Sequence, residues 1–418
     1  MEVSVVGLGY IGLPTALIFA QNGKQVCGVD TSQSVCDTIN QGKTHIVEPG
    51  LEEVAQKVHA TGNLHAITKP IESDNFIIAV PTPITKDKKA DLSYVKSAAQ
   101  AISEVLKPGN LVVLESTVPP RCTEDILVPE LEKSGLVAGK DFLVAHCPER
   151  VLPGQILYEL VHNNRIIGGI DKESGVAARD LYAAFVQGDM FLTSATTAEM
   201  CKLMENTYRD VNIALANELA LLCEKLEIDA WEVIRLANKH PRVNIHQPGP
   251  GVGGHCLAVD PWFIVEAQPE LANIIRLARE TNDGMPFHTA NLVATHTAAG
   301  GKVVLLGATY KPDIDDMRES PILTLYENLA ARGFDVVIVE PYNPDYAIDV
   351  YEAAKGADTL VLCVGHSVFS DIDLPRVSGL MRGKMLIDTK NYFDEAEVCE
   401  AGLSYVCLGN GITGRASE

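Results

Sequence analysis

The chain opens on a glycine-rich turn set between a short apolar run and an apolar stretch of helical character. Val3-Ser4-Val5-Val6 leads into Gly7-Leu8-Gly9-Tyr10-Ile11-Gly12. In a Rossmann unit the first glycine permits the tight turn, the second lets the backbone approach a pyrophosphate, and the third lets the helix pack closely on the sheet. The helix N-terminus then faces the phosphates with its free N–H groups. An ordinary βα turn can carry the same spacing, so the motif needs support from its surroundings.

The second predicted strand provides that support. It covers residues 25–29 and is followed directly by Asp30. Asp30 lies 18 residues after Gly12, near the distance of about 20 residues at which a ribose-binding acid is expected. A carboxylate there accepts a hydrogen bond from the ribose 2′-hydroxyl and repels a 2′-phosphate. The sequence therefore predicts a dinucleotide site that prefers NAD to NADP.

The rhythm of the chain predicts an α/β protein with three regions. A length of 418 residues suggests two or three domains. In residues 1–192, strands expected at 3–6, 25–29, 76–80, 111–114 and 142–145 alternate with helices at 14–22 and 94–106. In residues 193–295 the strand signal disappears, and helices are expected at 197–226, 231–237 and 271–282. In residues 296–418, strands at 302–306, 335–339, 359–364 and 384–387 return, with a helix at 321–332. We expect two Rossmann-like parallel-sheet domains joined by a long-helix central region.

Polar residues follow three of the predicted strands in the first region. They occur in Val80-Pro81-Thr82, Glu115-Ser116-Thr117 and Cys147-Pro148-Glu149. The carboxyl ends of parallel strands line the ligand crevice, although Pro, Ser and Thr are also common in loops for purely local reasons. Thr82 and Thr117 are candidate cofactor contacts, and Thr117 and Glu149 are candidate catalytic residues.

A second glycine-rich segment ends in a cysteine. Gln247-Pro248-Gly249-Pro250-Gly251-Val252-Gly253-Gly254-His255-Cys256 is followed by Asp260. Glycine at this density indicates a backbone that approaches a ligand closely. Cys256 is then a candidate nucleophile and Asp260 a candidate proton acceptor, although an unpaired cysteine is more often a small buried apolar residue.

The long helix carries Lys202, Asn206 and Arg209 at spacings that place them on one face. Such a row can be a solvated polar stripe. The same helix is rich in apolar residues, however, which favours a face that serves a ligand or a partner. A lysine, an amide and a thiol near a nicotinamide indicate covalent oxidation of an aldehyde.

Composition excludes several classes of protein. The chain has 34 basic and 55 acidic residues and a net charge of −21, which argues against binding to nucleic acid. Its ten cysteines lack the clustered spacing of a zinc site or a disulfide framework, so no metal is expected. The N-terminus has no basic region typical of a signal peptide, and no apolar stretch approaches the roughly 18 residues of a membrane helix. We expect a cytoplasmic protein that does not bind membranes.

Four stretches together resemble the UDP-glucose/GDP-mannose dehydrogenase family: CPERVLPGQ (147–155), AEMCKLMENTYRDVNIALANEL (198–219), HPRVNIHQPGPGVGGHC (240–256) and KPDIDDMRESP (311–321). The resemblance spans nearly the whole chain and is closest to members that act on UDP-N-acetyl-D-mannosamine. It implies an N-terminal NAD-binding domain, a helical core that forms a homodimer, and a C-terminal UDP-binding domain. It also implies a four-electron oxidation of the sugar C6 alcohol to a carboxylate with two NAD.

The resemblance also implies roles for single residues. Cys256 matches the nucleophile, Lys202 the acid/base or oxyanion-stabilising lysine, and Asn206 and Asp260 the residues that position the oxyanion and the water. NAD contacts are implied for Tyr10, Ile11, Asp30, Thr82 and Thr117, beside Gly7, Gly9 and Gly12 of the turn. Contacts with the UDP-sugar are implied for Arg150, Val151, Lys202, Asn206, Arg209, His240, Arg242, Gly253, Tyr310, Lys311, Arg318 and Lys390.

Departures from the UDP-glucose branch favour an N-acetylated sugar. That branch typically has serine before the nucleophile and lysine before the following aspartate, where this chain has His255 and Val259. It also has an aromatic residue and a second acid where this chain has Arg150 and Pro153. Three alternatives stay open: the same chemistry on UDP-N-acetylglucosamine, a two-electron β-hydroxyacid dehydrogenase, and an NAD-binding regulator without activity.

Overall fold

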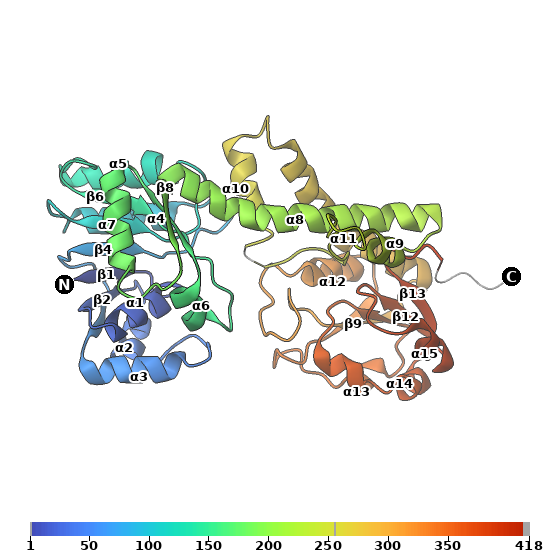
Figure 1. Cartoon of the computed structure of the whole chain (residues 1–418). Helices are drawn as coiled ribbons and strands as arrows, with labels where there is room; N and C mark the ends of the chain where they lie inside the picture. The colour runs from blue at the N-terminus through green and yellow to red at the C-terminus, as the bar shows by residue number, and fades with distance from the viewer. Residues whose placement is uncertain (1, 255, 413–418) are drawn as a thin grey trace. The chain divides into compact units, whose positions relative to one another are not determined.

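The computed structural model describes residues 2–254 and 256–412. Its internal contacts divide the chain into two compact units. Unit 1 comprises Met1–Glu205 and Glu266–Pro269, and unit 2 comprises Asn206–Val265 and Glu270–Glu418. Each unit is built around one sheet, coloured blue to green in unit 1 and orange to red in unit 2 (Figure 1).

The sheet of unit 1 has eight strands in the order β3-β2-β1-β4-β5-β6-β7-β8. Its strands are β1 (Val3–Val6), β2 (Val26–Val29), β3 (Leu64–Ile67), β4 (Asn75–Ile78), β5 (Leu111–Leu114), β6 (Leu143–His146), β7 (Arg165–Gly169) and β8 (Met190–Ser194). Strands β1 to β6 are parallel, but β7 runs antiparallel to β6 and parallel to β8. The carboxyl ends of the six parallel strands therefore share one edge.

Helices cover both faces of this sheet because successive strand residues point to opposite sides. Residues Val3 and Val5 of β1 belong to one core with helix α1 (Gly12–Gln21) and helix α7 (Lys172–Tyr182). Residues Phe76 and Ile78 of β4 belong to a second core with helix α4 (Ser93–Ser103) and helix α5 (Val128–Leu131). The remaining helices are α2 (Gln33–Asn40), α3 (Leu51–Thr61) and α6 (Ile156–His162).

Helix α8 (Ala195–Leu226) begins in unit 1 and ends in unit 2. The predicted long helix is therefore confirmed, and it starts two residues earlier than expected. It is followed by α9 (Ala230–Ala237), α10 (Asp260–Ala267) and α11 (Asn273–His296). The glycine-rich segment lies between α9 and α10. Among the described residues, no helix has the combined length and apolar character that crossing a bilayer requires.

The sheet of unit 2 has five parallel strands in the order β10-β9-β11-β12-β13. They are β9 (Lys302–Leu306), β10 (Asp335–Val339), β11 (Thr359–Leu362), β12 (Met385–Asp388) and β13 (Ser404–Cys407). Its helices are α12 (Pro321–Ala331), α13 (Val350–Ala354), α14 (Leu374–Leu380) and α15 (Glu395–Glu400). The order of the strands reverses between β9 and β11, where an open α/β sheet typically binds its ligand. The predicted class, two parallel-sheet domains joined by a long helix, is confirmed, apart from the antiparallel β7.

Candidate active site

The glycine turn of unit 1 has the geometry of a phosphate-binding turn. Gly7 has a φ of +93°, and a Cβ there would lie 2.5 Å from the Ala79 carbonyl oxygen. A Cβ at Gly12 would lie 1.8 Å from the Gly7 carbonyl oxygen, so both positions exclude a side chain. At Gly9, by contrast, the Cβ position is open, with no atom of the described residues within 4 Å. Within residues 2–254 and 256–412, no side chain caps the N-terminus of α1, and the first turn of this helix carries no acid. The turn can therefore accept an anion against its backbone.

Asp30 lies beside this turn, at the end of β2. Its Oδ2 accepts a hydrogen bond of 3.1 Å from the Leu8 N–H, and its Oδ1 accepts one of 2.9 Å from the Ser32 N–H. The half-buried carboxylate is thereby oriented at the edge of the turn. This is the position at which a ribose-binding acid acts.

The ends of β4 and β5 are joined by hydroxyl contacts. The Thr82 hydroxyl donates to the Thr117 carbonyl oxygen at 2.6 Å, and the Ser116 hydroxyl donates to the Val80 carbonyl oxygen at 2.7 Å. The two predicted threonines are therefore brought together by neighbouring strands. Their position at the carboxyl edge of the sheet suits contacts with a bound cofactor.

Glu149 follows β6 and belongs to a buried charged cluster that the sequence did not reveal. Arg165, on β7, has one guanidinium nitrogen 3.2 Å from Glu149 Oε2 and another 3.8 Å from Glu115 Oε1. Tyr182 donates to Glu115 at 2.6 Å. Burial raises the pKa of Glu115 to about 7, although Arg165 opposes the rise. The one available signal for Arg165 is a charged residue at the start of the apolar run Arg165-Ile166-Ile167.

Lys202 is half-buried, and two acids on α8, three residues before and after it in the chain, bind other segments of unit 1. Glu199 accepts hydrogen bonds from the N–H groups of Arg121 at 2.6 Å and Thr123 at 2.7 Å, in the segment that follows Thr117. Glu205 binds the Arg150 guanidinium, with contacts of 2.6 and 3.0 Å. Arg150 therefore presents a fixed plane, with part of its donor capacity already used.

In unit 2, the glycine-rich segment packs against residues of the C-terminal sheet. A Cβ at Gly253 would lie 3.0 Å from Tyr310 Cβ, and a Cβ at Gly249 would lie 2.6 Å from Lys390 Nζ. The Gly249 N–H donates to the Asn217 side chain on α8 at 2.9 Å. Burial lowers the pKa of the Lys390 ammonium, with Asp388 opposing. Three of the predicted substrate contacts, Gly253, Tyr310 and Lys390, thus border the same segment.

Cys256 ends this segment and is exposed, whereas seven of the other cysteines are buried. Burial raises the pKa of those thiols, for example that of Cys147 to about 12, so they are poor nucleophiles. The Cys256 carbonyl oxygen accepts from the Asp260 N–H at 2.9 Å. The Asp260 carboxylate accepts from the Asn206 side-chain amide at 2.6 Å. The structure therefore joins Asn206, Asp260 and the backbone of Cys256.

The remaining predicted substrate contacts lie mostly at the surface. Arg209, His240, Arg242, Lys311 and Arg318 are exposed, and Val151 is half-buried. Arg318 forms an ion pair of 2.7 Å with Asp316. His255, which distinguishes the chain from the UDP-glucose branch, lies outside the described residues.

Comparisons with known proteins match three successive segments of the chain to one family. Residues 1–186 match the NAD binding domain of the UDP-glucose/GDP-mannose dehydrogenase family, residues 196–284 its central domain, and residues 304–395 its UDP binding domain.

Individual relatives cover almost the entire length. A UDP-N-acetyl-D-mannosamine dehydrogenase of Methanococcus aeolicus is 45% identical over 98% of this chain and 95% of its own. An NDP-N-acetyl-D-galactosaminuronic acid dehydrogenase of Ralstonia nicotianae is 45% identical over 95% of this chain and 97% of its own. The solved UDP-N-acetyl-mannosamine dehydrogenase of Pyrococcus horikoshii has a TM-score of 0.91 and 42% identity, and covers 99% of this chain and 100% of its own. The chain therefore belongs to the UDP-glucose/GDP-mannose dehydrogenase family and carries its NAD-binding domain.

Proposed function

We propose that this protein oxidises the C6 alcohol of UDP-N-acetyl-D-mannosamine to a carboxylate with two equivalents of NAD. The observation that carries the proposal is the exposed thiol of Cys256 at the end of the glycine-rich segment, beside the Asn206–Asp260 pair. A two-electron dehydrogenase needs no nucleophile, and a regulator without activity needs neither the thiol nor the pair. The arrangement therefore favours covalent oxidation beyond the aldehyde.

The glycine turn of unit 1 fits a dinucleotide. The open space at Gly9 leaves room for a pyrophosphate against the backbone, and Asp30 is oriented for a ribose hydroxyl. When bound, NAD supplies the hydride acceptor. Tyr10, Ile11, Thr82 and Thr117 would complete its contacts.

The chain's own residues would carry the remaining steps. Lys202, or a water held by Asp260, removes the C6 hydroxyl proton as the first hydride leaves. The Cys256 thiolate then adds to the aldehyde carbon, and loss of the second hydride leaves a thioester. Water cleaves the thioester, which returns the thiol and releases the carboxylate.

Several side chains would support these steps. Lys202 and Asn206 stabilise the oxyanions formed at the sugar carbon, and the loss of one such donor typically costs about 2.7–4 kcal/mol. Glu149, held by Arg165, would assist the hydrolytic water.

The choice of sugar rests on similarity and on Arg150. Relatives named as UDP-N-acetyl-D-mannosamine dehydrogenases align over nearly the full chain. The Arg150 guanidinium, whose plane Glu205 fixes, would direct a remaining donor at the acetamido carbonyl. A 45% identical relative named for N-acetyl-D-galactosaminuronic acid makes the corresponding galactosamine nucleotide a second candidate, beside UDP-N-acetylglucosamine.

The chemistry can be tested separately from the choice of sugar. The unaltered protein should release two NADH per sugar acid, whereas a two-electron dehydrogenase would release one NADH and no carboxylate. Cys256→Ala should abolish acid formation and leave NAD binding intact. Cys399→Ala is the matched control because Cys399 is also exposed but lies on α15. Normal acid formation by Cys256→Ala would refute the nucleophile.

The choice of sugar is tested with a panel of UDP-sugars. UDP-N-acetylmannosamine should have the highest kcat/KM and UDP-glucose the lowest, because a donor that is positioned for an acetamido group, here Arg150, goes unpaired without it. Comparable kcat/KM values for UDP-N-acetylmannosamine and its C2 epimer UDP-N-acetylglucosamine would refute the mannosamine assignment and leave the oxidation chemistry intact.

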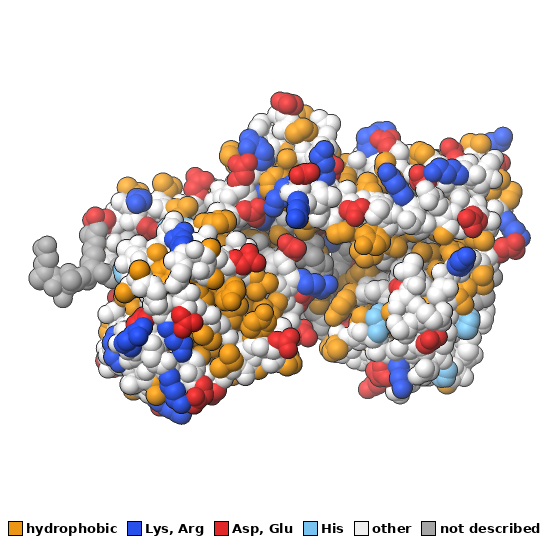
Figure 2. Space-filling model, turned by 180° about the vertical axis from the view of Figure 1, so that it is seen from behind, with side chains coloured by type: hydrophobic (Ala, Val, Ile, Leu, Met, Phe, Trp, Pro, Cys, Tyr) orange, Lys and Arg blue, Asp and Glu red, His pale blue; other side chains and the backbone are white. Residues whose placement is uncertain are grey.

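We further propose that the protein is a homodimer through α8. Large apolar side chains are exposed along this helix at Met204, Tyr208, Leu215, Leu222 and Leu226. Successive members are four, seven, seven and four residues apart, which places them in one stripe along the helix. Hydrophobic side chains also gather in patches among the interspersed charges on the face shown in Figure 2. Leu215→Glu with Leu222→Glu should give a monomer by sedimentation, whereas Ile348→Glu, also at an exposed position, should not. A monomeric unaltered protein would refute the dimer.

A further inference from the structure

In each sheet, an acid follows the strand that comes second along the chain: Asp30 follows β2, and Glu340 follows β10. The two acids differ in their surroundings. Asp30 in unit 1 is half-buried and accepts from the turn that follows β1. Glu340 in unit 2 is fully buried and accepts from the turn that follows β9, at 2.7 Å from the Ala308 N–H and 3.2 Å from the Thr309 N–H. Burial works to raise the pKa of Glu340, but hydrogen bonds from His366, Ala308 and Tyr342 outweigh it and hold the pKa below its ordinary value. The Glu340 carboxylate is therefore part of the interior of unit 2.

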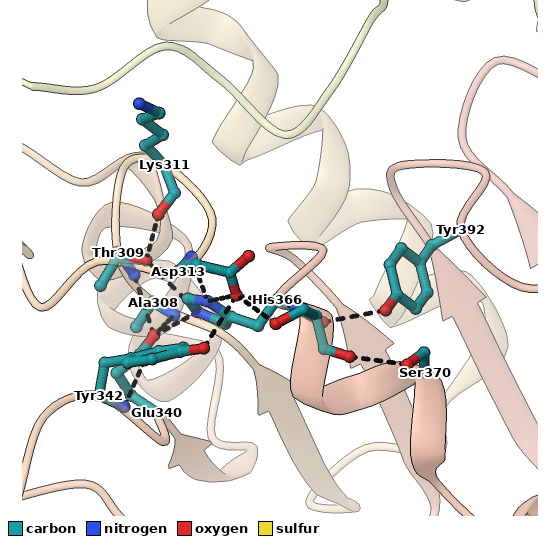
Figure 3. Close-up of polar contacts among 10 residues, drawn as sticks. Ala308, Thr309, Lys311, Asp313, Glu340, Tyr342, His366, Ser370 and Tyr392 are labelled. Atoms are coloured by element: carbon teal, nitrogen blue, oxygen red, sulfur yellow. Dashed lines mark hydrogen bonds and ion pairs between the residues drawn. The ribbon is translucent and has the colours of Figure 1, made fainter. Parts of the chain in front are cut away.

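A buried histidine joins this acid to the loop after β9. Figure 3 shows the His366 imidazole between Glu340 and Asp313. Its Nε2 lies 2.9 Å from Glu340 Oε2, and its Nδ1 lies 2.9 Å from the Asp313 backbone nitrogen. His366 follows β11, Glu340 follows β10, and Asp313 belongs to the loop after β9. We call His366, Glu340 and Asp313 the histidine brace, because they tie together segments that follow three neighbouring strands.

The contacts of the ring determine its tautomer. The Asp313 N–H can only donate, so Nδ1 accepts and carries no proton. Nε2 therefore carries the proton and donates it to the Glu340 carboxylate. Each ring nitrogen thus has a defined partner, and the ring holds both the acid and the loop.

Asp313 itself has a backbone that needs such support. Its φ is +59°, in the left-handed region that costs energy for a residue other than glycine. Its carboxylate accepts from the Ser367 N–H at 2.8 Å and from the Tyr342 hydroxyl at 3.0 Å. Together with the bond to His366, these contacts hold a strained turn in the loop that carries Tyr310 and Lys311.

We propose that His366 is a positioning residue that sets the affinity of unit 2 for the UDP part of its ligand. The inference rests on the proposed function, in which Tyr310 and Lys311 contact the nucleotide. The brace fixes the backbone on both sides of these residues, through Ala308 and Thr309 before them and Asp313 after them. Because a loop that is ordered in advance loses less entropy on binding, release of the brace weakens the binding of UDP.

The test is titration calorimetry of the full-length protein with UDP alone and with NAD alone. His366→Ala should raise the Kd for UDP by about tenfold or more and change the Kd for NAD by less than about twofold. His366→Asn keeps an acceptor near the Nδ1 position for the Asp313 N–H and should recover part of the affinity. Ser370→Ala is the matched control, since Ser370 donates to the Ser367 carbonyl oxygen and the Asp371 side chain rather than to a member of the histidine brace.

A second variant covers the case in which a buried substitution at position 366 prevents folding. Asp313 is exposed, and Asp313→Ala removes its carboxylate contacts while keeping the strained backbone, so it should also raise the Kd for UDP. An unchanged Kd for UDP in Asp313→Ala, or in a folded His366→Ala, would refute the proposed role of the histidine brace in UDP binding. If the unaltered protein bound no UDP, both the proposed function and this inference would fail, whereas unchanged variants of a UDP-binding protein refute the inference alone.

Discussion

Two glycines of unit 2, Gly253 and Gly284, offer a matched test of how closely the glycine-rich segment is packed. Neither has a left-handed backbone, so the same substitution by alanine meets no conformational penalty at φ in either case. Their surroundings are opposite. A Cβ at Gly253 would lie 2.6 Å from the Glu319 carbonyl oxygen and 2.7 Å from Pro321 Cδ, whereas a Cβ at Gly284 would have none of the described atoms within 4 Å.

The expected magnitudes follow from these contacts. The neighbours of Gly253 are backbone and a proline ring, which cannot rotate away, so Gly253→Ala should lower the free energy of unfolding by about 1–3 kcal/mol. Gly284 is exposed within helix α11, where alanine is favoured over glycine by about 1 kcal/mol. Gly284→Ala should therefore raise the free energy of unfolding by up to that amount. The rate of sugar-acid formation should also differ between the two variants. Gly253 lies three residues before Cys256, and a displacement of about 1 Å at a reacting group typically costs about 100-fold in rate.

The assay is urea denaturation followed by tryptophan fluorescence, together with sugar-acid formation. The chain has two tryptophans, Trp231 and Trp262, and both lie in unit 2, so the fluorescence reports the unit that carries the substitutions. The reasoning is refuted if Gly253→Ala matches Gly284→Ala in both stability and rate.

Three other substitutions probe single contacts. Asp30→Ala should bring the ratio of kcat/KM for NAD over NADP down toward one; an unchanged ratio would show that another group selects the cofactor. Asn206→Ala removes the amide that donates to the buried Asp260 carboxylate at 2.6 Å, so unfolding of unit 2 should become easier by about 1–3 kcal/mol, and unchanged tryptophan-monitored unfolding would contradict this. Burial raises the pKa of Glu199 from 4.5 to about 7, so the folded chain keeps a proton there that the unfolded chain releases. The contribution of Glu199 to stability is therefore complete below pH 4.5 and declines by up to about 3 kcal/mol as the pH rises to 7. Glu199→Gln should remove that decline. The measurement is the urea midpoint of the variant and of the unaltered protein, followed by circular dichroism at pH 5 and 7.5. If the two midpoints differ by the same amount at both pH values, the assignment of the decline to Glu199 is refuted.

Much of the fold can be read from local patterns. The expected ranges for β1, β5, β9 and β10 agree with the structure at both ends. These strands belong to parallel sheets whose faces are covered, so each appears as a mostly apolar run between turns, interrupted by Ser4 in β1 and preceded by a charged first residue in β9 and β10. Strand β8 gives no such run, because most of its side chains are partly or fully exposed. The reversed direction of β7 also leaves no local trace, since strand direction depends on the pairing partner.

Single site residues were predicted from the sequence where a short motif carries the chemistry, as at Gly7, Asp30 and Cys256. Their supporting contacts were not, because they join residues far apart in the chain. Asn206 and Asp260 are 54 positions apart, and His366 and Asp313 are 53 apart. The order of the strands, β10-β9-β11, makes the segments of Asp313 and His366 neighbours, and the approach of α10 to α8 brings Asp260 to Asn206. Neither depends on a local pattern. The sequence by itself thus determined the chemistry that is available to this protein. Only the tertiary structure decided which acid is buried, because burial depends on the packing of segments that are distant in the chain.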